Sequence, residues 1–414
     1  MKFSAFGLKE QLLSNIEAMG FRKPTDIQYK SMRPILGGDD VLAIAQTGTG
    51  KTAAFAIPAV ENLLRSQRRL HYKGVRCIIM EPTHELAQQS GAVLEKLVVN
   101  TGLNVLAIYG GVDQAPQIEQ LQRGVDILVA TPGRMFDLAS QGYLDVSLCE
   151  ILILDEADHM LDLGFIEDIR QLVRRLPRHR QTLFFSATIN EKIKKLAYSV
   201  VNKPVNIRIS PKDMVSRNVA HCVLWVTMDE KRFYLERIAK EHPDDRIIVF
   251  VRTKVRAERV CQAMKRVDVK AVSMHGDLGQ RDRNNALDQF RKGEVQILVA
   301  TDITARGIDI PSVPYVVNYD VPDIPENYVH RVGRTGRGMD KGNALTLCAP
   351  EEKETLKAVE EFIGGPINRM VLDLEEREAT IDFSMANNDH DDWQSLIFEE
   401  EARRSKIKGK KKFY

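Results

Sequence analysis

The stretch ILILDEADHM, residues 151–160, predicts both a buried strand and a site of chemistry. Four large aliphatic residues run directly into the acids Asp155 and Glu156, and Asp158 follows two positions later. A short, continuous apolar run is typical of a strand that is buried on both faces of a parallel sheet. Carboxylates at the end of such a strand lose hydration, so they need a partner there.

Similar apolar runs recur along the chain with helical patterns between them. This alternation predicts an α/β fold whose parallel sheets are covered by helices on both faces. In the first half, the expected strands are 41–46, 75–80, 105–110, 126–131, 150–155 and 182–188. In the second half, they are 246–251, 271–276, 296–302, 315–320 and 344–349.

The pattern also predicts where the chain divides. The segment 201–221 contains Pro204 and Pro211 and lacks helical periodicity, so we interpret it as the joint between two α/β domains. After about residue 365 the alternation stops. The expected organisation is a first domain over 1–207, a linker over 208–220, a second domain over 221–365 and a charged, flexible tail over 366–414.

The composition favours a soluble protein of the cytoplasm. Hydrophobic residues make up 43% and charged residues 28% of the 414 residues, and the formal net charge is +2. We find neither an apolar run of membrane-spanning length nor an apolar signal core at the N-terminus. Scattered cysteines favour reduced thiols over metal binding: Cys77, Cys149, Cys222, Cys261 and Cys348.

The stretch AQTGTGKT, residues 45–52, stands between a strand and a helical pattern, which is the context of a phosphate-binding loop. Gly48 and Gly50 let the backbone curl so that its N–H groups point at phosphate oxygens. Lys51 is expected to reach the β- and γ-phosphates, and Thr52 to place its hydroxyl on Mg²⁺. Ala45 replaces the first glycine of the general pattern, so a plain Gly/Thr-rich turn is the alternative.

A nucleotide bound to this loop would supply the partner that the acids of the opening stretch need. In such folds a strand-end Asp holds the Mg²⁺ of the nucleotide, a role that fits Asp155. Glu156 would then orient or polarise the attacking water. The alternative is an acid pair that caps the start of a loop.

The stretch HRVGRTGR, residues 330–337, presents Arg331, Arg334 and Arg337 at intervals of three. Arginine suits bidentate contact with phosphate, and an arginine supplied from a second domain can act on the γ-phosphate as a finger. A basic patch for an RNA backbone is the alternative.

Taken together, these motifs resemble those of DEAD-box ATP-dependent RNA helicases, including the compact bacterial rhlE-like members. The resemblance covers about Phe3 to residue 365 and rests on an ordered set: AQTGTGKT, DEAD (155–158), SAT (186–188), ARGID (305–309) and HRVGRTGR. It implies two tandem RecA-like domains that hydrolyse ATP with Mg²⁺. It also implies that domain closure is coupled to RNA binding and to local strand separation of short duplexes.

The resemblance implies roles for residues around the nucleotide. GFRKPTDIQ (20–28) is similar to the family's Q motif, in which Gln28 would read the adenine edge and Phe21 would pack on the ring. The catalytic residues would be Glu156 and the arginine fingers Arg334 and Arg337. Nucleotide contacts are implied for the loop and for one ribose contact from the second domain: Ala45, Gln46, Thr47, Gly48, Thr49, Gly50, Lys51, Thr52 and Asp309.

The resemblance further implies coupling and RNA contacts. Ser186 and Thr188 match the motif that links ATP hydrolysis to strand separation, through hydrogen bonds to Asp158. Largely sequence-independent RNA contacts carry over to Pro82, Thr83, Gly110, Gly111, Thr131, Arg134, Arg252, Arg283, Thr301 and Asp302.

One position departs from the family pattern. His84 in PTHELA (82–87) stands where the family usually has Arg. A neutral imidazole removes a permanent positive charge, so we expect slightly weaker and more pH-sensitive RNA binding. A tolerated surface substitution is the alternative.

Two other functions share much of this motif set. One is an RNA clamp or scaffold that barely unwinds, and duplex-release assays would distinguish it. The other is a DNA translocase with a related core, which a comparison of ATPase stimulation by RNA and by DNA would distinguish. The basic tail RRSKIKGKKKFY (403–414) is interpreted as a flexible RNA tether or a solubilising end.

Overall fold

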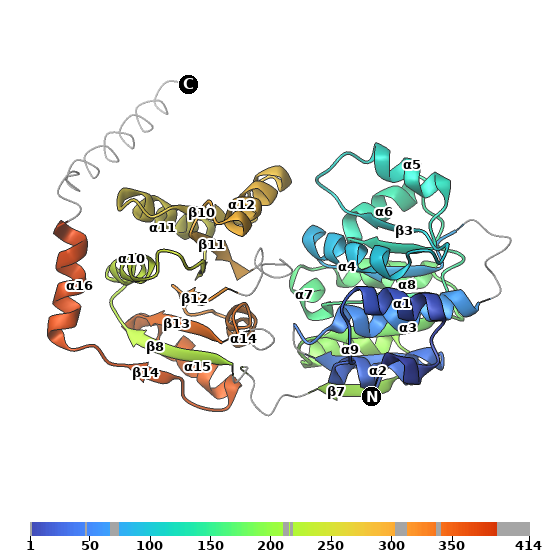
Figure 1. The fold of residues 1–414 in the computed structure, drawn as a ribbon, viewed down its shortest axis with the longest axis horizontal. Coiled ribbons are helices and arrows are strands. Elements are labelled where there is room, and N and C mark those ends of the chain that lie inside the picture. The colour runs from blue at the N-terminus through green and yellow to red at the C-terminus, as the bar shows by residue number, and fades with distance from the viewer. Residues whose placement is uncertain are drawn as a thin grey trace, which may run out of the picture.

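The computed structural model describes residues 2–45, 48–66, 74–209, 215, 218–302, 313–336 and 341–386. Gln46, Thr47, Asp309 and Arg337 lie outside these ranges, as do residues 387–414 of the expected tail. Two α/β units lie side by side, and each contains a seven-stranded parallel sheet among its described residues (Figure 1). The α/β fold with two tandem sheets is therefore confirmed.

The first unit has the strand order β3-β4-β2-β5-β6-β1-β7. Its elements are η1 (Phe3–Phe6), α1 (Glu10–Ala18), α2 (Asp26–Leu36), β1 (Val41–Ala45), α3 (Lys51–Arg65), β2 (Cys77–Met80), α4 (His84–Leu97), β3 (Val105–Ile108), α5 (Ala115–Arg123), β4 (Ile127–Ala130), α6 (Pro132–Ser140), β5 (Ile151–Leu154), α7 (Ala157–Asp162), α8 (Ile166–Arg175), β6 (Gln181–Ser186), α9 (Glu191–Val200) and β7 (Val205–Ile209).

The second unit has the strand order β10-β11-β9-β12-β13-β8-β14. Its elements are β8 (Val219–Trp225), α10 (Lys231–Glu241), β9 (Ile247–Val251), α11 (Lys254–Arg266), β10 (Ala271–Met274), α12 (Gln280–Lys292), β11 (Ile297–Thr301), β12 (Tyr315–Asn318), α14 (Pro325–Val332), β13 (Gly342–Cys348), η3 (Pro350–Glu352), α15 (Lys353–Ile363), β14 (Asn368–Met370) and α16 (Leu374–Ala386).

The strand β5 is buried on both faces, as its sequence predicts. Ile151 and Ile153 belong to the core beneath α1 to α4, whereas Leu152 and Leu154 belong to the core on the opposite face. The neighbours β2 and β6 pair with β5 in parallel, so the carboxyl ends of these strands meet at one edge of the sheet. The acids that follow β5 therefore emerge at that edge.

The expected joint and tail were wrong in part, because each contains an edge strand. Residues 205–209, within the expected joint 201–221, form β7 and pair with β1, and β8 begins at Val219. Within the expected tail, β14 pairs with β8 and α16 follows it. The strands β7 and β14 expose most of their residues, so neither carries the continuous apolar run that marks a central strand.

No helix in the described part of the chain is long and apolar enough to cross a membrane.

Candidate active site

The loop between β1 and α3 has the backbone of a phosphate site. Gly48 and Gly50 have φ values of 80° and 87°, in the left-handed region that favours glycine. The helix α3 begins at Lys51, and no described side chain caps its N-terminus. Its first N–H groups and its positive end are therefore oriented to bind an anion.

Gln28 on α2 is hydrogen-bonded to this loop. Its Oε1 accepts a hydrogen bond from Thr25 N at 3.0 Å, and its Nε2 donates one to Gly50 O at 3.1 Å. A Cβ atom at Gly50 would lie 2.6 Å from Gln28 Nε2, so a side chain there would displace the Gln28 amide from its hydrogen bond. Phe21 is half-buried and packs against the core of the first unit. The two residues thus lie on the segment that leads to the loop, and their adenine contacts stay predictions.

Lys51 and Glu156 meet across the site. Lys51 Nζ lies 2.7 Å from Glu156 Oε1, and the lysine side chain is only 5% exposed. Burial alone would lower the pKa of Lys51, but the charges of Glu156, Asp155 and Asp158 raise it above its ordinary value. Glu156 has φ 47° and ψ 47°, a left-handed conformation that is strained for a non-glycine residue and is typical of functional sites.

Asp155 is buried at the same strand end. Burial is the largest effect and raises the pKa of Asp155 to about 7, whereas the charge of Lys51 lowers it. The positive charge of Lys51 is therefore too small to offset the cost of burying Asp155 in its ionised form. Together with the hydroxyl of Thr52 at the start of α3, the carboxylate of Asp155 provides hard oxygen ligands of the kind that Mg²⁺ prefers. These two residues fit the metal ion of a nucleotide.

Asp158 links the acids to β6. Thr188 donates two hydrogen bonds to Asp158 Oδ2, from its N and its Oγ1, both at 3.0 Å. Ser186 instead donates to Thr188 O at 2.8 Å. The expected bond to Asp158 is therefore present for Thr188, whereas Ser186 acts on Asp158 only through Thr188.

Glu81 is a further acid of this edge that none of the sequence motifs includes. It follows β2, is fully buried and accepts a hydrogen bond from Ser90 Oγ at 2.6 Å, whereas its Oε2 has no described partner. Burial, followed by the charge of Asp155, raises the pKa of Glu81 well above its ordinary value. The signal was available, because CIIM followed by Glu81 repeats the pattern of ILIL followed by Asp155.

Replacing Glu81 by Gln is expected to stabilise the nucleotide-free protein increasingly as the pH rises. The unfolded glutamate releases its proton near the ordinary pKa of 4.5, whereas the folded one retains it. The folded wild type thus binds more protons, so its stability falls with rising pH, and the variant lacks that fall. Urea unfolding of both proteins from about pH 5 to about pH 8 measures the difference. A difference that stays constant with pH would contradict this result.

Arg334 brings positive charge from the second unit towards the same acids. It follows α14 and is buried. Burial would raise the pKa of Glu156, but Lys51, followed by His330 and Arg334, lowers it below its ordinary value. The second unit therefore contributes to the electrostatics of the loop site.

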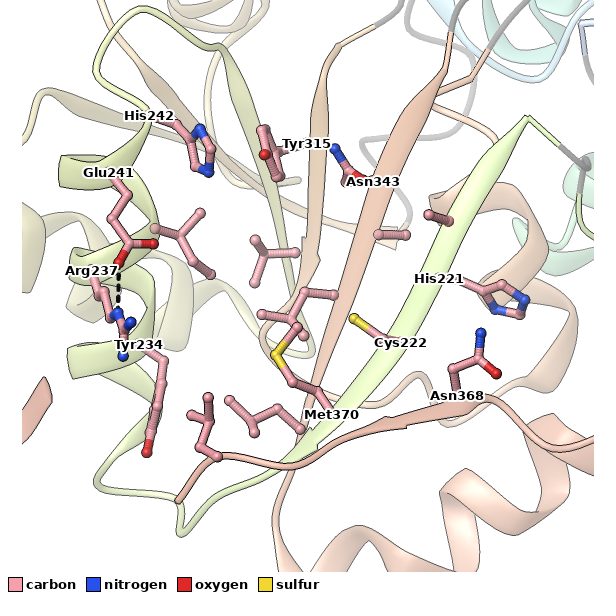
Figure 2. A pocket seen from close by; sticks show the side chains of 17 residues that line it. His221, Cys222, Tyr234, Arg237, Glu241, His242, Tyr315, Asn343, Asn368 and Met370 are labelled. Atoms are coloured by element: carbon pink, nitrogen blue, oxygen red, sulfur yellow. Dashed lines mark hydrogen bonds and ion pairs between the residues drawn. The ribbon is translucent and has the colours of Figure 1, made fainter. Parts of the chain in front are cut away.

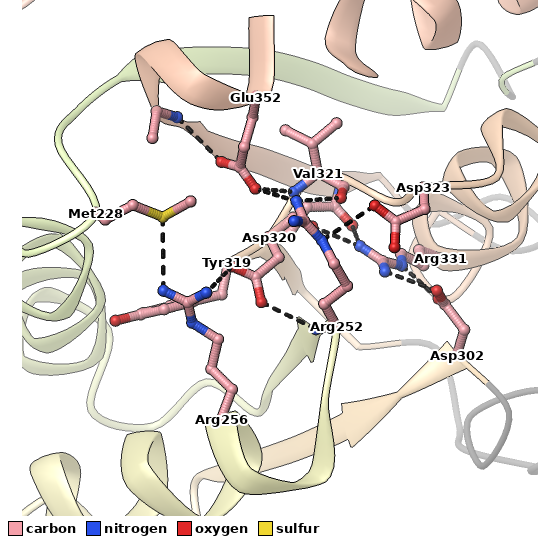
Figure 3. Close-up of polar contacts among 12 residues, drawn as sticks. Met228, Arg252, Arg256, Asp302, Tyr319, Asp320, Val321, Asp323, Arg331 and Glu352 are labelled. Carbon is pink, nitrogen blue, oxygen red and sulfur yellow. Dashed lines mark hydrogen bonds and ion pairs between the residues drawn. The ribbon is translucent and has the colours of Figure 1, made fainter. Parts of the chain in front are cut away.

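Several expected RNA contacts are already engaged within the second unit (Figure 3). Asp302 accepts two hydrogen bonds from Arg331, at 2.5 and 2.8 Å. Arg252 donates to Glu352 Oε1 at 2.5 Å and lies 3.2 Å from Asp323 Oδ1. These side chains connect the carboxyl ends of β9, β11 and β12. An RNA strand could therefore contact only those donor and acceptor atoms that these bonds leave available.

The remaining RNA candidates lie at helix starts and loops. Thr83 and Thr131 precede α4 and α6, and Thr83 Oγ1 accepts a hydrogen bond from Leu86 N at 3.3 Å. Arg134 donates to Val112 O at 2.8 Å, and Arg283 donates to Gly276 O at 2.7 Å. The other four RNA candidates lie at or just after the carboxyl ends of strands: Pro82, Gly110, Gly111 and Thr301.

The second unit has a lysine in the position of Lys51, but that position is filled. Lys231 is the first residue of α10, as Lys51 is of α3, and each helix follows the corresponding strand of its sheet. Lys231 is fully buried and lies 2.5 Å from Glu352 Oε2 and 3.7 Å from Asp320 Oδ1. The segment 226–230 that precedes α10 contains no glycine, unlike the loop before α3, so the first unit is the candidate for the nucleotide site.

An apolar pocket of about 570 Å³ lies elsewhere in the second unit, between α10 and the strands β8, β12, β13 and β14 (Figure 2). Cys222, Tyr234 and Met370 are among its lining residues, and Arg237 pairs with Glu241 at its rim. None of the residues assigned to the nucleotide or RNA lines it.

The fold and the loop define a phosphate-loop ATPase of two tandem α/β units. The family model "DEAD/DEAH box helicase" matches residues 25–196, and the model "Helicase conserved C-terminal domain" matches residues 230–339. The chain belongs to the DEAD/DEAH box helicase family.

Known proteins support this membership. The chain is 41% identical over 360 residues to the ATP-dependent RNA helicase CshA of Listeria monocytogenes, covering 87% of this chain and 68% of that protein. S. cerevisiae Dbp5 bound to RNA and ADP BeF3 aligns at 28% identity and TM-score 0.78, over 94% of this chain and 99% of that one. A DEAD box protein from Methanococcus jannaschii aligns at 34% identity and TM-score 0.51, over 90% and 99%. The rhlE-like subgroup stays a prediction.

Proposed function

We propose that this DEAD-box ATP-dependent RNA helicase works as a two-domain clamp, which closes on RNA when ATP is bound. The observation that carries the proposal is the convergence of three charged groups. Lys51 of the phosphate loop pairs with Glu156, and Arg334 of the second unit acts on the same carboxylate. The alignment with an RNA- and nucleotide-bound protein extends over both units, which supports a closed arrangement.

In this proposal the first unit binds the nucleotide. The backbone of Gly48 and Gly50 and the start of α3 hold the phosphates, Lys51 contacts the β- and γ-phosphates, and Gln28 recognises adenine. ATP binding would take Lys51 from Glu156, which frees the carboxylate to accept a proton from the attacking water. Asp155 and Thr52 would hold Mg²⁺, which offsets the negative charge of the phosphates.

The second unit completes the site. Arg334 would stabilise the charge that develops on the γ-phosphate. Arg337 and Asp309, outside the described residues, are proposed to act on the γ-phosphate and the ribose. Because both units then contribute to one site, hydrolysis would depend on closure, and RNA lying across both units would favour closure. A strand bent by the clamp cannot stay in a regular duplex, so closure would separate base pairs locally.

The strands suggest the working domain boundaries. The first domain would extend to Ile209, the connection would comprise residues 210–218, and the second domain would begin at Val219 and include β14. We also propose a cytoplasmic location, which is supported by five free cysteines.

The proposal is tested by steady-state ATP hydrolysis with and without single-stranded RNA, for the wild type and for Lys51→Ala. RNA should stimulate the wild type strongly, and the variant should lose the activity. Lys194→Ala, an exposed lysine of α9, is the matched control and should behave as the wild type. Hydrolysis that ignores RNA would mean that the units do not close on it as proposed.

Replacing His84 by Arg is expected to strengthen RNA binding and make it less dependent on pH. His84 begins α4, and its ring lies 5.7 Å from that of Tyr109, beside the loop of Gly110. One added phosphate contact would steepen the dependence of log affinity on log salt by about 0.7 for a single strand. Fluorescence anisotropy with labelled RNA at several pH values and salt concentrations measures both effects. Equal affinities under all conditions would exclude a role for this position.

A further inference from the structure

A second, strongly basic hollow lies on the second unit, between the start of α10 and the length of α11. Its volume is about 640 Å³. Four arginines line it, against a single acid, Asp229: Arg232, Arg256, Arg259 and Arg266. None of these residues belongs to the nucleotide site or to the RNA contacts assigned above.

Three of the four arginines have a guanidinium charge that no described acid neutralises. Arg256 lies 3.3 Å from Asp320 Oδ1 and donates a hydrogen bond to Met228 Sδ at 3.5 Å. In contrast, Arg232, Arg259 and Arg266 are exposed and form no ion pair with any described residue. An excess of unpaired positive charge around a hollow attracts a polyanion and focuses its field there.

The arginines of α11 form one stripe. Arg256, Arg259 and Arg266 are separated by three and seven residues, a spacing that keeps them on one face of the helix. The stripe extends about 15 Å along the axis. A linear arrangement of charge over this length suits an extended phosphodiester backbone.

The hollow borders one of the expected RNA contacts. Thr253, which lines it, directly follows Arg252 at the carboxyl end of β9. Figure 3 shows Arg256 on the Met228 side, Arg252 in the middle and Arg331 with Asp302 on the other side. A strand that crosses the clamp at Arg252 therefore needs only to continue past Thr253 to reach the stripe.

We propose that an RNA strand leaving the clamp continues along this hollow, with its phosphates on Arg259, Arg266 and Arg232. The inference rests on the proposed function and adds a binding segment to it. The contacts would be independent of sequence, because Tyr319 is buried beneath Arg256 and offers no ring face to a base. A nucleotide is a poorer fit, because Lys231 beside the hollow is already paired with Glu352.

The test compares RNA affinity as a function of salt for two strands. One strand is just long enough for maximal ATPase stimulation, and the other is the same strand lengthened at its 5′ or its 3′ end. The variant is Arg259→Ala with Arg266→Ala. Lys265→Ala with Lys270→Ala is the control, because it removes the same charge from exposed positions that do not line the hollow.

For one of the lengthened strands, the salt slope of the Arg259→Ala, Arg266→Ala variant should be lower than that of the wild type by about 1.4, the effect of two lost phosphate contacts. The short strand should bind and stimulate wild type, variant and control alike. Equal slopes for the lengthened strands would overturn the inference, and would leave an acidic protein segment as the class of ligand for the hollow. Failure of the wild type to bind or respond even to the short strand would instead overturn the proposed function.

Discussion

Replacing Glu156 by Gln is expected to slow ATP hydrolysis by about 100-fold to 10,000-fold, the range typical of a lost general base. Glutamine keeps the size of the side chain, and its oxygen can still accept a hydrogen bond from Lys51, which now lies 2.7 Å from Glu156 Oε1. It cannot take a proton from water. The variant should therefore bind ATP and RNA but should not reopen, so the RNA stays trapped.

Two measurements check this expectation. Single-turnover hydrolysis gives the chemical step, and the release of labelled RNA into an excess of unlabelled RNA gives the lifetime of the closed complex. Glu167→Gln on α8, an exposed glutamate far from the loop in sequence, is the matched control. If Glu156→Gln releases RNA with bound ATP as fast as the wild type does, the clamp cycle is wrong.

The sequence predicted the central strands well, because burial on both faces leaves a local signal. The apolar runs at 150–155 and 246–251 correspond to β5 and β9, which are buried throughout. Edge strands carry no such signal. The strand β7 has the sequence VNIRI and is recognisable only through its pairing with β1, a contact between residues far apart in the chain.

The residues of the candidate site also fall into two groups, those with a local sequence signal and those without one. The loop at Lys51 and the acids at Asp155 and Glu156 were predictable, because each depends on a few consecutive residues at a strand end. The pairing of Asp302 with Arg331 was not, since both look like RNA contacts in sequence and their ion pair depends on tertiary structure. Sequence indicates which groups carry charge, but not which charges the fold already uses.

Replacing Glu352 by Ala is expected to destabilise the second unit by about 3–5 kcal/mol, the cost of removing one partner from a buried ion pair. Glu352 is buried and accepts four hydrogen bonds: from Lys231 Nζ, Arg252 Nη2, Ala349 N and Val321 N. Without this carboxylate, Lys231 keeps only Tyr319 O and the more distant Asp320.

Trp225 on β8 can report the unfolding of this unit. The chain has two tryptophans, so a Trp393→Phe background leaves Trp225 as the single fluorophore. Urea unfolding in that background should show the large loss for Glu352→Ala and almost none for Glu354→Ala, an exposed neighbour on α15. A loss below about 1 kcal/mol would contradict the network, since that is the scale of an exposed ion pair.

A double-mutant cycle separates the ion pair from other losses. Lys231→Met removes the buried cation, so in its presence Glu352→Ala no longer leaves that charge unpaired. The double variant should therefore lose less stability than the two single variants lose in sum. Additive losses would mean that Glu352 acts through Arg252 and the backbone alone. Coupling would instead identify Glu352 as the group that neutralises Lys231 within the second unit.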